Sequence, residues 1–168
     1  IWLSSDLTSV FKFYQFWLNM DDEGVGDYLK IYTEIMPDEF DKLMADFKND
    51  PAKRIAQKFL AYEVTKIVHG EEAANRAKKM TEVLFDDRNV AELSDTEFKE
   101  LAEELPNSKN DDLLEFLVET KLAESKSAAR RLVEQGSIQI NGAKADLNTK
   151  FSTESLVKKG KNSFAVKL

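Results

Sequence analysis

Apolar residues recur at intervals of three and four through the first hundred residues, which is the spacing of amphipathic helices. Helix start signals divide this pattern into six segments, because each begins with a capping residue, a Pro at the first helical position or acidic residues in the first turn. The starts are Ser9, Asp21–Glu23, Pro37, Asp50–Pro51, Glu71–Glu72 and Ser94. The pattern therefore predicts a helical bundle over residues 1–105.

The pattern changes after residues 106–110, whose Pro, Asn, Ser and Lys are typical of a linker. A short apolar helix is predicted at 113–118, packed against a second helix that starts after Ser125. Apolar and polar residues then alternate toward the chain end, which indicates strands. The sequence therefore predicts a mainly α fold. The helical bundle is followed, over residues 111–168, by a small α+β module of two helices and a β-hairpin or sheet.

The second of these helices carries a basic outer face. Ser125 is a good N-cap, because its hydroxyl can accept from the free amides of the first turn. At 100° per residue, the Ala, Leu and Val residues of the helix share one face, and Arg130 and Arg131 lie on the other. A left-handed helix stop, a half-buried strand and a hairpin turn are predicted to follow, at Gly136, Ser137–Asn141 and Asn141-Gly142.

The formal net charge of −7 argues against a nucleic-acid partner, but the charge is unevenly distributed. Residues 1–110 carry 14 Lys and Arg against 23 Asp and Glu, a net −9, whereas residues 121–168 carry 10 against 4, a net +6. Attraction to phosphate is screened beyond roughly 8 Å at physiological salt, so the local field of the tail matters more than the total. The basic tail therefore indicates an RNA-binding surface.

Composition excludes several other classes of site. The 168 residues include no Cys, so neither a disulfide framework nor a thiolate metal site is possible, and a cytoplasmic protein is expected. No apolar run approaches the ~18 residues of a membrane span, so no membrane partner is expected. The chain opens on Ile1 without Met or a signal-peptide pattern, which favours a piece of a longer protein. The sequence contains no Gly-rich phosphate loop, Ser/His/Asp set or metal-ligand spacing.

The order of helix, Gly, strand and Asn-Gly turn in residues 125–144 resembles the S-four-type RNA-binding module, first known from a small-subunit ribosomal protein. In that family the helix with the pattern Ser-x-Ser-x-Ala-Arg-x-Leu and the turns after it face RNA. The resemblance implies that five residues lie near phosphate: Lys126, Arg130, Arg131, Asn141 and Lys144. From the helix alone, an ordinary solvated charged face is an equally good interpretation, whereas the complete order favours RNA.

Two earlier stretches, Phe11–Asn19 and Ala56–Ala73, resemble the helical anticodon-binding domain of bacterial-type tyrosyl-tRNA synthetases. That family also ends in an S-four-type module, so the similarity covers essentially the whole chain in family order. It implies that the Rossmann-type catalytic domain precedes this segment, because the HIGH-like and KMSKS-like motifs are absent here. Val10 departs from the family, which commonly has Pro at this first helical turn.

Two single residues carry further expectations. By the same resemblance, Asp22 lies near the anticodon, where its carboxylate can accept hydrogen bonds from the ring N–H and amino group of a guanine. The alternative is that Asp22 only places negative charge at a helix start. His69 is the only histidine, and it is expected to act as a cationic partner of the helix dipole just before Gly70, not as a catalyst.

The resemblance therefore implies a segment that positions tRNA-Tyr, through its anticodon and variable-arm region, for aminoacylation by the catalytic domain of the same chain. The segment alone is expected to be inactive, to need no cofactor or metal and to be a monomer. ATP and tyrosine would bind the missing domain, and the full-length protein is expected to be a homodimer. The alternative is an RNA-independent helical protein-interaction module that docks through its aromatic first helix, but it leaves the basic tail unexplained.

Overall fold

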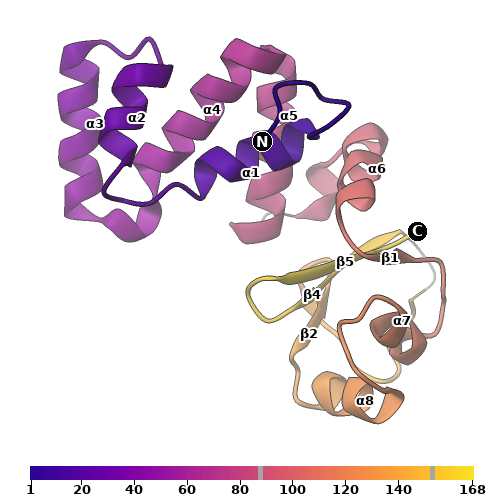
Figure 1. Ribbon diagram of the computed structural model, residues 1–168. Coiled ribbons are helices and arrows are strands. Elements are labelled where there is room, and N and C mark those ends of the chain that lie inside the picture. Colours follow the sequence, from indigo (N-terminus) through magenta and orange to yellow (C-terminus); the bar gives the residue numbers. More distant parts are fainter. Residues whose placement is uncertain (87–88, 152–153) are drawn as a thin grey trace. The chain divides into compact units, whose positions relative to one another are not determined.

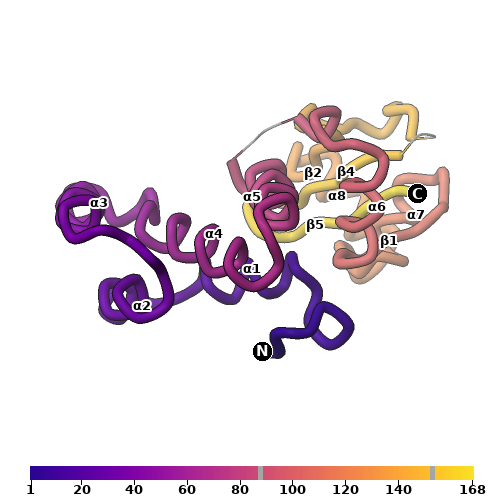
Figure 2. Tube along the Cα trace, turned by 90° about the horizontal axis from the view of Figure 1, so that it is seen from above, coloured from indigo at the N-terminus to yellow at the C-terminus, as the bar shows by residue number. Residues whose placement is uncertain are grey.

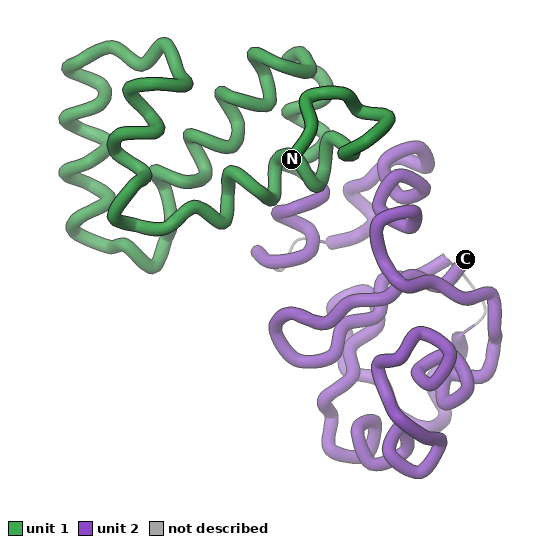
Figure 3. Tube along the Cα trace, viewed as in Figure 1, with its two compact units in different colours: residues 1–79 green, residues 80–168 purple. Residues whose placement is uncertain are grey.

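The computed structural model of the chain describes residues 1–86, 89–151 and 154–168. In this part of the chain, six α-helices precede the first strand, and two helices and four strands follow it (Figure 1). This order confirms the predicted mainly α fold with a small α+β module. The chain divides into two compact units, Ile1–Lys79 and Met80–Leu168 (Figure 3). The division falls inside helix α5 (Glu71–Phe85).

Unit 1 is built from helices that share one apolar core. Its elements before α5 are α1 (Val10–Leu18), α2 (Val25–Tyr32), α3 (Pro37–Asn49), the 3-10 turn η1 (Pro51–Lys53) and α4 (Ile55–His69). α1 lies alongside α4 in both views (Figure 1 and Figure 2). The buried core side chains are Phe13, Val25, Leu29, Phe47, Ala56, Leu60 and Val64. The four helices α1 to α4 therefore all contribute to one core.

Local sequence signals set most helix starts. α1 begins where the sequence predicts, because Ser9 Oγ accepts from the backbone N–H of Lys12 at 3.2 Å. α3 likewise begins at its predicted Pro. α2 begins later than predicted, because the side chain of Asp21 accepts from the N–H of Gly24 at 2.6 Å and holds the acidic residues in a turn before the helix.

The start of α4 corrects the sequence prediction. Asp50-Pro51 is a good start signal, but the helix that it opens is only the short turn η1. Arg54 then has a left-handed φ of 52°, which no residue inside an α-helix adopts, so α4 begins one residue later, at Ile55. The tertiary contacts that hold Arg54 in this conformation are part of the candidate site described below.

Unit 2 contains the end of α5, the 3-10 turn η2 (Val90–Glu92), α6 (Asp95–Glu104), α7 (Leu113–Glu119), α8 (Lys126–Glu134) and five strands. The strands are β1 (Asn107–Ser108), β2 (Ile138–Ile140), β3 (Ala143–Lys144), β4 (Ser155–Lys159) and β5 (Ser163–Lys167). Their order in the sheet is β1-β5-β4-β2-β3, with β1 parallel to β5 and the other described pairs antiparallel. Within the three described ranges, no helix has both the length and the apolar content to cross a bilayer.

Helices α7 and α8 pack against each other, as the sequence predicts, and the structure places their apolar faces on one side of the sheet. Their shared core with the strands includes Leu113, Phe116, Leu117, Ala129, Val133, Ile138, Val157 and Ala165. Because successive residues of a strand alternate between the two faces, Gln139 and Lys158 lie on the face of the sheet that turns away from α7 and α8. The sheet therefore has a helix-covered face and a second face of mixed polarity.

The stretch 106–110 carries strand β1, which pairs with β5. It is also held by Lys167, whose side chain is 4% exposed and forms an ion pair with Asp111 at 3.0 Å. The ammonium of Lys167 donates to the backbone carbonyl of Lys109 at 3.0 Å as well. The domain boundary expected here stays a prediction. The structure adds that this stretch belongs to the edge of the sheet.

His69, the last residue of α4, packs against an aromatic ring of α1. Its ring stands edge-on to Phe13 with the centroids 4.8 Å apart, and its Nε2 is buried without a hydrogen-bond partner in the described part of the chain. Burial lowers the pKa of His69 below its ordinary value of 6.5. A cation that serves the helix dipole would have a raised pKa, so that interpretation of His69 is wrong.

We expect the free energy of unfolding to fall when the pH drops from about 7.5 to about 5.5. The unfolded chain binds a proton at His69 near pH 6.5, whereas the folded chain takes it up only at lower pH, so acidification favours the unfolded state in this window. Denaturant unfolding at the two pH values measures the loss. The variant His69→Gln should show a flatter dependence, and the same loss in both proteins would contradict this assignment.

Candidate nucleic-acid interface

Helix α8 presents the predicted basic face because its other face is fixed in the core. Ser125 Oγ accepts from the N–H of Ala128 at 3.2 Å and so sets the first turn. Ala129 and Val133 are buried against the sheet, which fixes the rotation of the helix. Arg130 and Arg131 are consequently exposed to solvent.

The two arginines are available to a partner. Within the described part of the chain, neither the Arg130 nor the Arg131 side chain makes a hydrogen bond or an ion pair. A guanidinium carries five N–H donors in a planar fork that matches phosphate geometry. The outer face of α8 therefore offers two unshared cations of the type that binds phosphate best.

Lys144 reaches the far end of the same helix. Gly136 has the predicted left-handed φ, at 65°, and ends α8. A Cβ placed on Gly136 would lie 3.7 Å from Cδ and 3.9 Å from Nζ of Lys144, so this side chain lies against the helix terminus. A cation is favoured there by the helix dipole. The structure thus brings Lys144 from β3 to the end of the helix that carries Arg130 and Arg131.

Lys126, unlike Arg130 and Arg131, has an ion-pair partner in the described part of the chain. It is the first residue of α8, and its ammonium forms a short ion pair with Oε1 of Glu115 on α7. The side chain of Asn110 donates to the other oxygen of Glu115 at 3.1 Å and so helps to hold the carboxylate in place. Sequence reasoning missed Glu115, because 11 residues separate the two partners and they lie on different helices.

The same contact shifts the titration of both groups. The hydrogen bond from Lys126 is the main cause that lowers the pKa of Glu115, and the hydrogen bond from Asn110 adds to it. The hydrogen bond to Glu115 raises the pKa of Lys126. Both groups therefore stay charged around neutral pH. Any anionic partner would have to compete with Glu115 for Lys126.

Asn141 has a structural task in the hairpin turn. Asn141 and Gly142 have φ values of 49° and 83°, the positive values that the predicted two-residue turn requires. Oδ1 of Asn141 accepts from the N–H of Leu156 at 2.9 Å, which ties the turn to β4. Its expected position near phosphate stays a prediction, and the side chain would contribute by shaping the turn.

Asp22 belongs to unit 1 and lies in the loop before α2. Its Oδ1 accepts from Nε2 of Gln57 at 2.6 Å and lies 3.9 Å from Nη1 of Arg54. Gln57 is fully buried, whereas the Asp22 side chain is 53% exposed. Since α2 begins only after its N-cap Gly24, Asp22 is not part of the first helical turn. The buried side chain of Gln57 thus orients the Asp22 carboxylate, which is otherwise open to solvent.

Arg54 fixes the loop that carries Asp22. Its Nη2 donates to the carbonyl oxygens of Leu18 and Met20, both at 2.9 Å, and so joins the end of α1 to the start of α4. Arg54 and Gln57 were not identifiable from the sequence pattern. Their contacts span 34 to 36 residues, and no local signal marks an Arg or a Gln for such a role.

Two family models match the chain and cover most of it. Residues 1–86 match tRNA synthetases class I (W and Y), which defines the class of protein. Residues 94–166 match the SYY-like C-terminal domain of tyrosine–tRNA ligases. The chain therefore belongs to the tyrosyl-tRNA synthetase family, and the resemblance stated from its sequence is confirmed.

Individual relatives agree with this result. The tyrosine–tRNA ligase of Levilactobacillus brevis is 42% identical over 98% of this chain and 42% of the relative. Tyrosine–tRNA ligase 2 of Bacillus cereus is 35% identical over 99% of this chain and 42% of the relative. A crystal structure of a C-terminally truncated mitochondrial tyrosyl-tRNA synthetase from Aspergillus nidulans is 39% identical, with a TM-score of 0.50 over 51% of this chain and 24% of that chain. The chain spans about two fifths of the length of these curated relatives.

Proposed function

We propose that this chain binds tRNA-Tyr and positions it for aminoacylation by a catalytic domain of the longer protein. The observation that carries the proposal is the outer face of α8. Arg130 and Arg131 are exposed there and make no side-chain hydrogen bond or ion pair within the described residues. They belong to the region that matches the family's C-terminal domain. Phosphate is the partner that two such guanidinium groups suit best.

The two units would contact different parts of the tRNA. Arg130, Arg131 and Lys144 would hold phosphates of the variable-arm region, which fixes the orientation of the tRNA without reading its sequence. Asp22 would accept hydrogen bonds from the edge of an anticodon base, because unstacked bases expose their donors. A carboxylate is suited to this second task, since base edges offer N–H groups whereas phosphates do not.

The proposal includes the rest of the protein. ATP and tyrosine would bind the catalytic domain, so this chain alone should neither activate tyrosine nor charge tRNA. The isolated chain would be a monomer, and the full-length protein a homodimer in the cytoplasm.

The alternative of an RNA-independent interaction module receives less support. It relies on an exposed aromatic face of α1, but Phe13 is fully buried and Tyr14 is 2% exposed. Phe16, at 41% exposed, is the side chain of α1 that such a docking face would use. α1 therefore contributes most of its aromatic surface to the interior of unit 1.

We expect Arg130→Ala and Arg131→Ala each to weaken binding of tRNA-Tyr and to flatten its salt dependence. Each lost phosphate contact releases one counterion fewer, so the slope of log K against log salt should change by roughly one unit or less. Fluorescence anisotropy with labelled tRNA at several salt concentrations measures both quantities. The loss should be similar for tRNA-Tyr and for a tRNA altered only in its anticodon.

Two matched variants control this experiment. Lys126→Ala should have a smaller effect than Arg130→Ala, because Glu115 already shares the charge of Lys126. Lys99→Ala removes an exposed charge from α6, and it should leave the affinity nearly unchanged. If the arginine variants bind as the unaltered chain does, with the same salt slope, the face of α8 is only solvated and the proposed function fails.

A further inference from the structure

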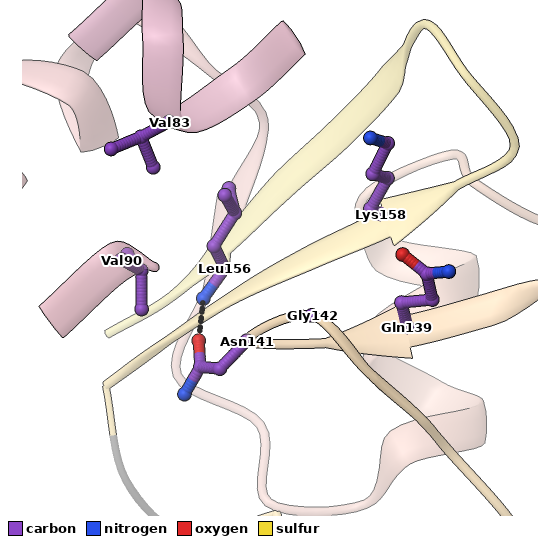
Figure 4. Close-up of a pocket in the computed structure, with 7 residues that line it drawn as sticks. All are labelled: Val83, Val90, Gln139, Asn141, Gly142, Leu156 and Lys158. Carbon is purple, nitrogen blue, oxygen red and sulfur yellow. Dashed lines mark hydrogen bonds between the residues drawn. The ribbon is translucent and has the colours of Figure 1, made fainter. Parts of the chain in front are cut away.

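The second face of the sheet in unit 2 contains a cavity of about 230 Å³. Its walls come from the end of α5, from η2 and from strands β2 and β4 with the turn between β2 and β3 (Figure 4). The lining residues are Val83, Val90, Gln139, Asn141, Gly142, Leu156 and Lys158. Because α8 packs on the opposite face of the sheet, the cavity is separate from the cations Arg130, Arg131 and Lys144.

The walls of the cavity differ in chemistry. Val83, Val90 and Leu156 supply apolar surface from three different elements. Gln139 and Lys158 are direct partners in the β2–β4 register, and their side chains stand side by side on the same face (Figure 4). Within the described residues, no side-chain hydrogen bond involves the Gln139 amide. The ammonium of Lys158 lies 5.7 Å above the centre of the Phe164 ring, which keeps it on this face.

The rim of the cavity is held by a hydrogen bond and is accessible. The hydrogen bond from the N–H of Leu156 to Oδ1 of Asn141 closes the turn at the edge of the pocket (Figure 4). Next to it, a Cβ at Gly142 would have no other atom within 4 Å, so the space outside the turn is open. A ligand can therefore approach this edge without a change in the backbone.

We propose that this cavity binds a single unstacked nucleotide of an RNA. The apolar side chains would contact the faces of the base, the amide of Gln139 would hydrogen-bond its edge, and Lys158 would meet its phosphate. This inference rests on the proposed function in one respect, because that function supplies the RNA. The cavity would form a second contact, independent of the phosphates held by α8.

The chemistry of the lining favours a nucleotide over other ligands. An amide is both donor and acceptor, as the hydrogen-bonding edge of any base requires, and RNA-binding proteins read unstacked bases in this way. Among the described residues of the lining, Lys158 is a cation and none is a carboxylate, which suits an anionic group. The volume is below the roughly 300–1,000 Å³ of pockets that enclose drug-sized ligands, so it suits one base-sized group.

The first test titrates the isotope-labelled chain with the four nucleoside 5′-monophosphates and follows backbone amide shifts by NMR. We expect shifts concentrated at residues 139–142 and 156–158. Gln139→Ala and Lys158→Ala should each weaken binding about tenfold, which is the effect of one lost hydrogen bond or ion contact of ordinary strength. Inorganic phosphate or an unphosphorylated nucleoside should bind more weakly than the monophosphate, because each lacks one half of the contacts.

The controls separate the cavity from the general charge of the tail. Lys161→Ala removes a lysine from the exposed β4–β5 turn outside the cavity, and it should leave the titration unchanged. Val90→Phe should reduce binding by filling the apolar part while keeping every charge. If the monophosphates shift no residue of the cavity, or if Lys161→Ala and Lys158→Ala weaken binding equally, the proposal is overturned.

The second test identifies the source of the nucleotide. Gln139→Ala should lower tRNA-Tyr affinity without changing the salt slope, whereas Lys158→Ala should also reduce the slope by roughly one unit or less. Monophosphate binding with unaltered tRNA affinity in both variants would overturn the assignment to RNA. If the arginine variants of α8 bind tRNA-Tyr as the unaltered chain does, the proposed function is overturned, but the titration of the cavity with monophosphates is unaffected. Failure of the proposed function can therefore be distinguished from failure of the cavity proposal.

Discussion

Leu117→Ala is expected to lower the free energy of unfolding by about 2–5 kcal/mol, the range for a large aliphatic side chain removed from a packed core. Leu117 lies on α7, is fully buried and belongs to the cluster that α7, α8 and the sheet share. The substitution leaves a cavity beneath α8, and domains of this size have a total stability of only about 5–15 kcal/mol. Denaturant unfolding followed by circular dichroism measures the change.

The same substitution should weaken tRNA binding, although Leu117 itself is inaccessible to RNA. The rotation of α8, and hence the direction of Arg130 and Arg131, depends on this core. The control is Leu147→Ala, the same chemical change at a side chain that is 48% exposed, and it should cost below about 1 kcal/mol. Equal losses in the two variants would show that the cluster does not hold α8 in place.

The elements that the sequence predicts well are those encoded by neighbouring residues. The Ser125 cap, the stop at Gly136 and the Asn141-Gly142 turn each depend on a few consecutive residues, and all three are confirmed. The helix start at Ser94 is confirmed in the same way, and the structure shows it as a capping box in which Glu97 is bonded back to the cap. Local hydrogen bonds of this kind are available to the chain before any tertiary contact forms.

The features that sequence reasoning missed depend on contacts between distant residues. The charge of Lys126 is visible in the sequence, but its pairing with Glu115 requires α7 and α8 to be placed side by side. A histidine before a helix-ending Gly suggests a cation, yet the ring of Phe13, 56 positions earlier, buries His69 and favours its neutral form. The cavity on the sheet likewise exists only once η2 approaches strands β2 and β4.

Arg54→Ala is expected to destabilise unit 1 by about 2 kcal/mol and to reduce discrimination at the anticodon. Hydrogen bonds from a charged group contribute roughly 1.5–3 kcal/mol each, and Arg54 donates two, to Leu18 and Met20. Its side chain is 39% exposed, so solvent screening reduces the sum. Without these bonds the loop that carries Asp22 loses its fixed position. Unfolding and binding of tRNAs with altered anticodons measure the two effects.

The comparison with Asp22→Asn tests whether the two residues act together. If Asp22 accepts from the edge of an anticodon base, as proposed, Asp22→Asn should reduce anticodon discrimination while leaving the salt slope nearly unchanged. Arg54→Ala should reduce discrimination in the same direction, and the double variant should lose little more than either single one. Additive losses in the double variant would mean that Arg54 does not act through Asp22.

Two further variants separate the side chain of Arg54 from its backbone. Arg54→Gly relieves the left-handed φ of 52°, so it should be more stable than Arg54→Ala by roughly 1 kcal/mol. Anticodon discrimination should nevertheless stay low in Arg54→Gly, because no guanidinium donates to the carbonyls of Leu18 and Met20. Lys53→Ala removes the adjacent charge, which pairs with Asp50 on the surface, and should change stability by about 0.5 kcal/mol or less. Discrimination restored by Arg54→Gly would show that only the helix start matters, and that the guanidinium has no part in the proposed contact of Asp22 with the anticodon.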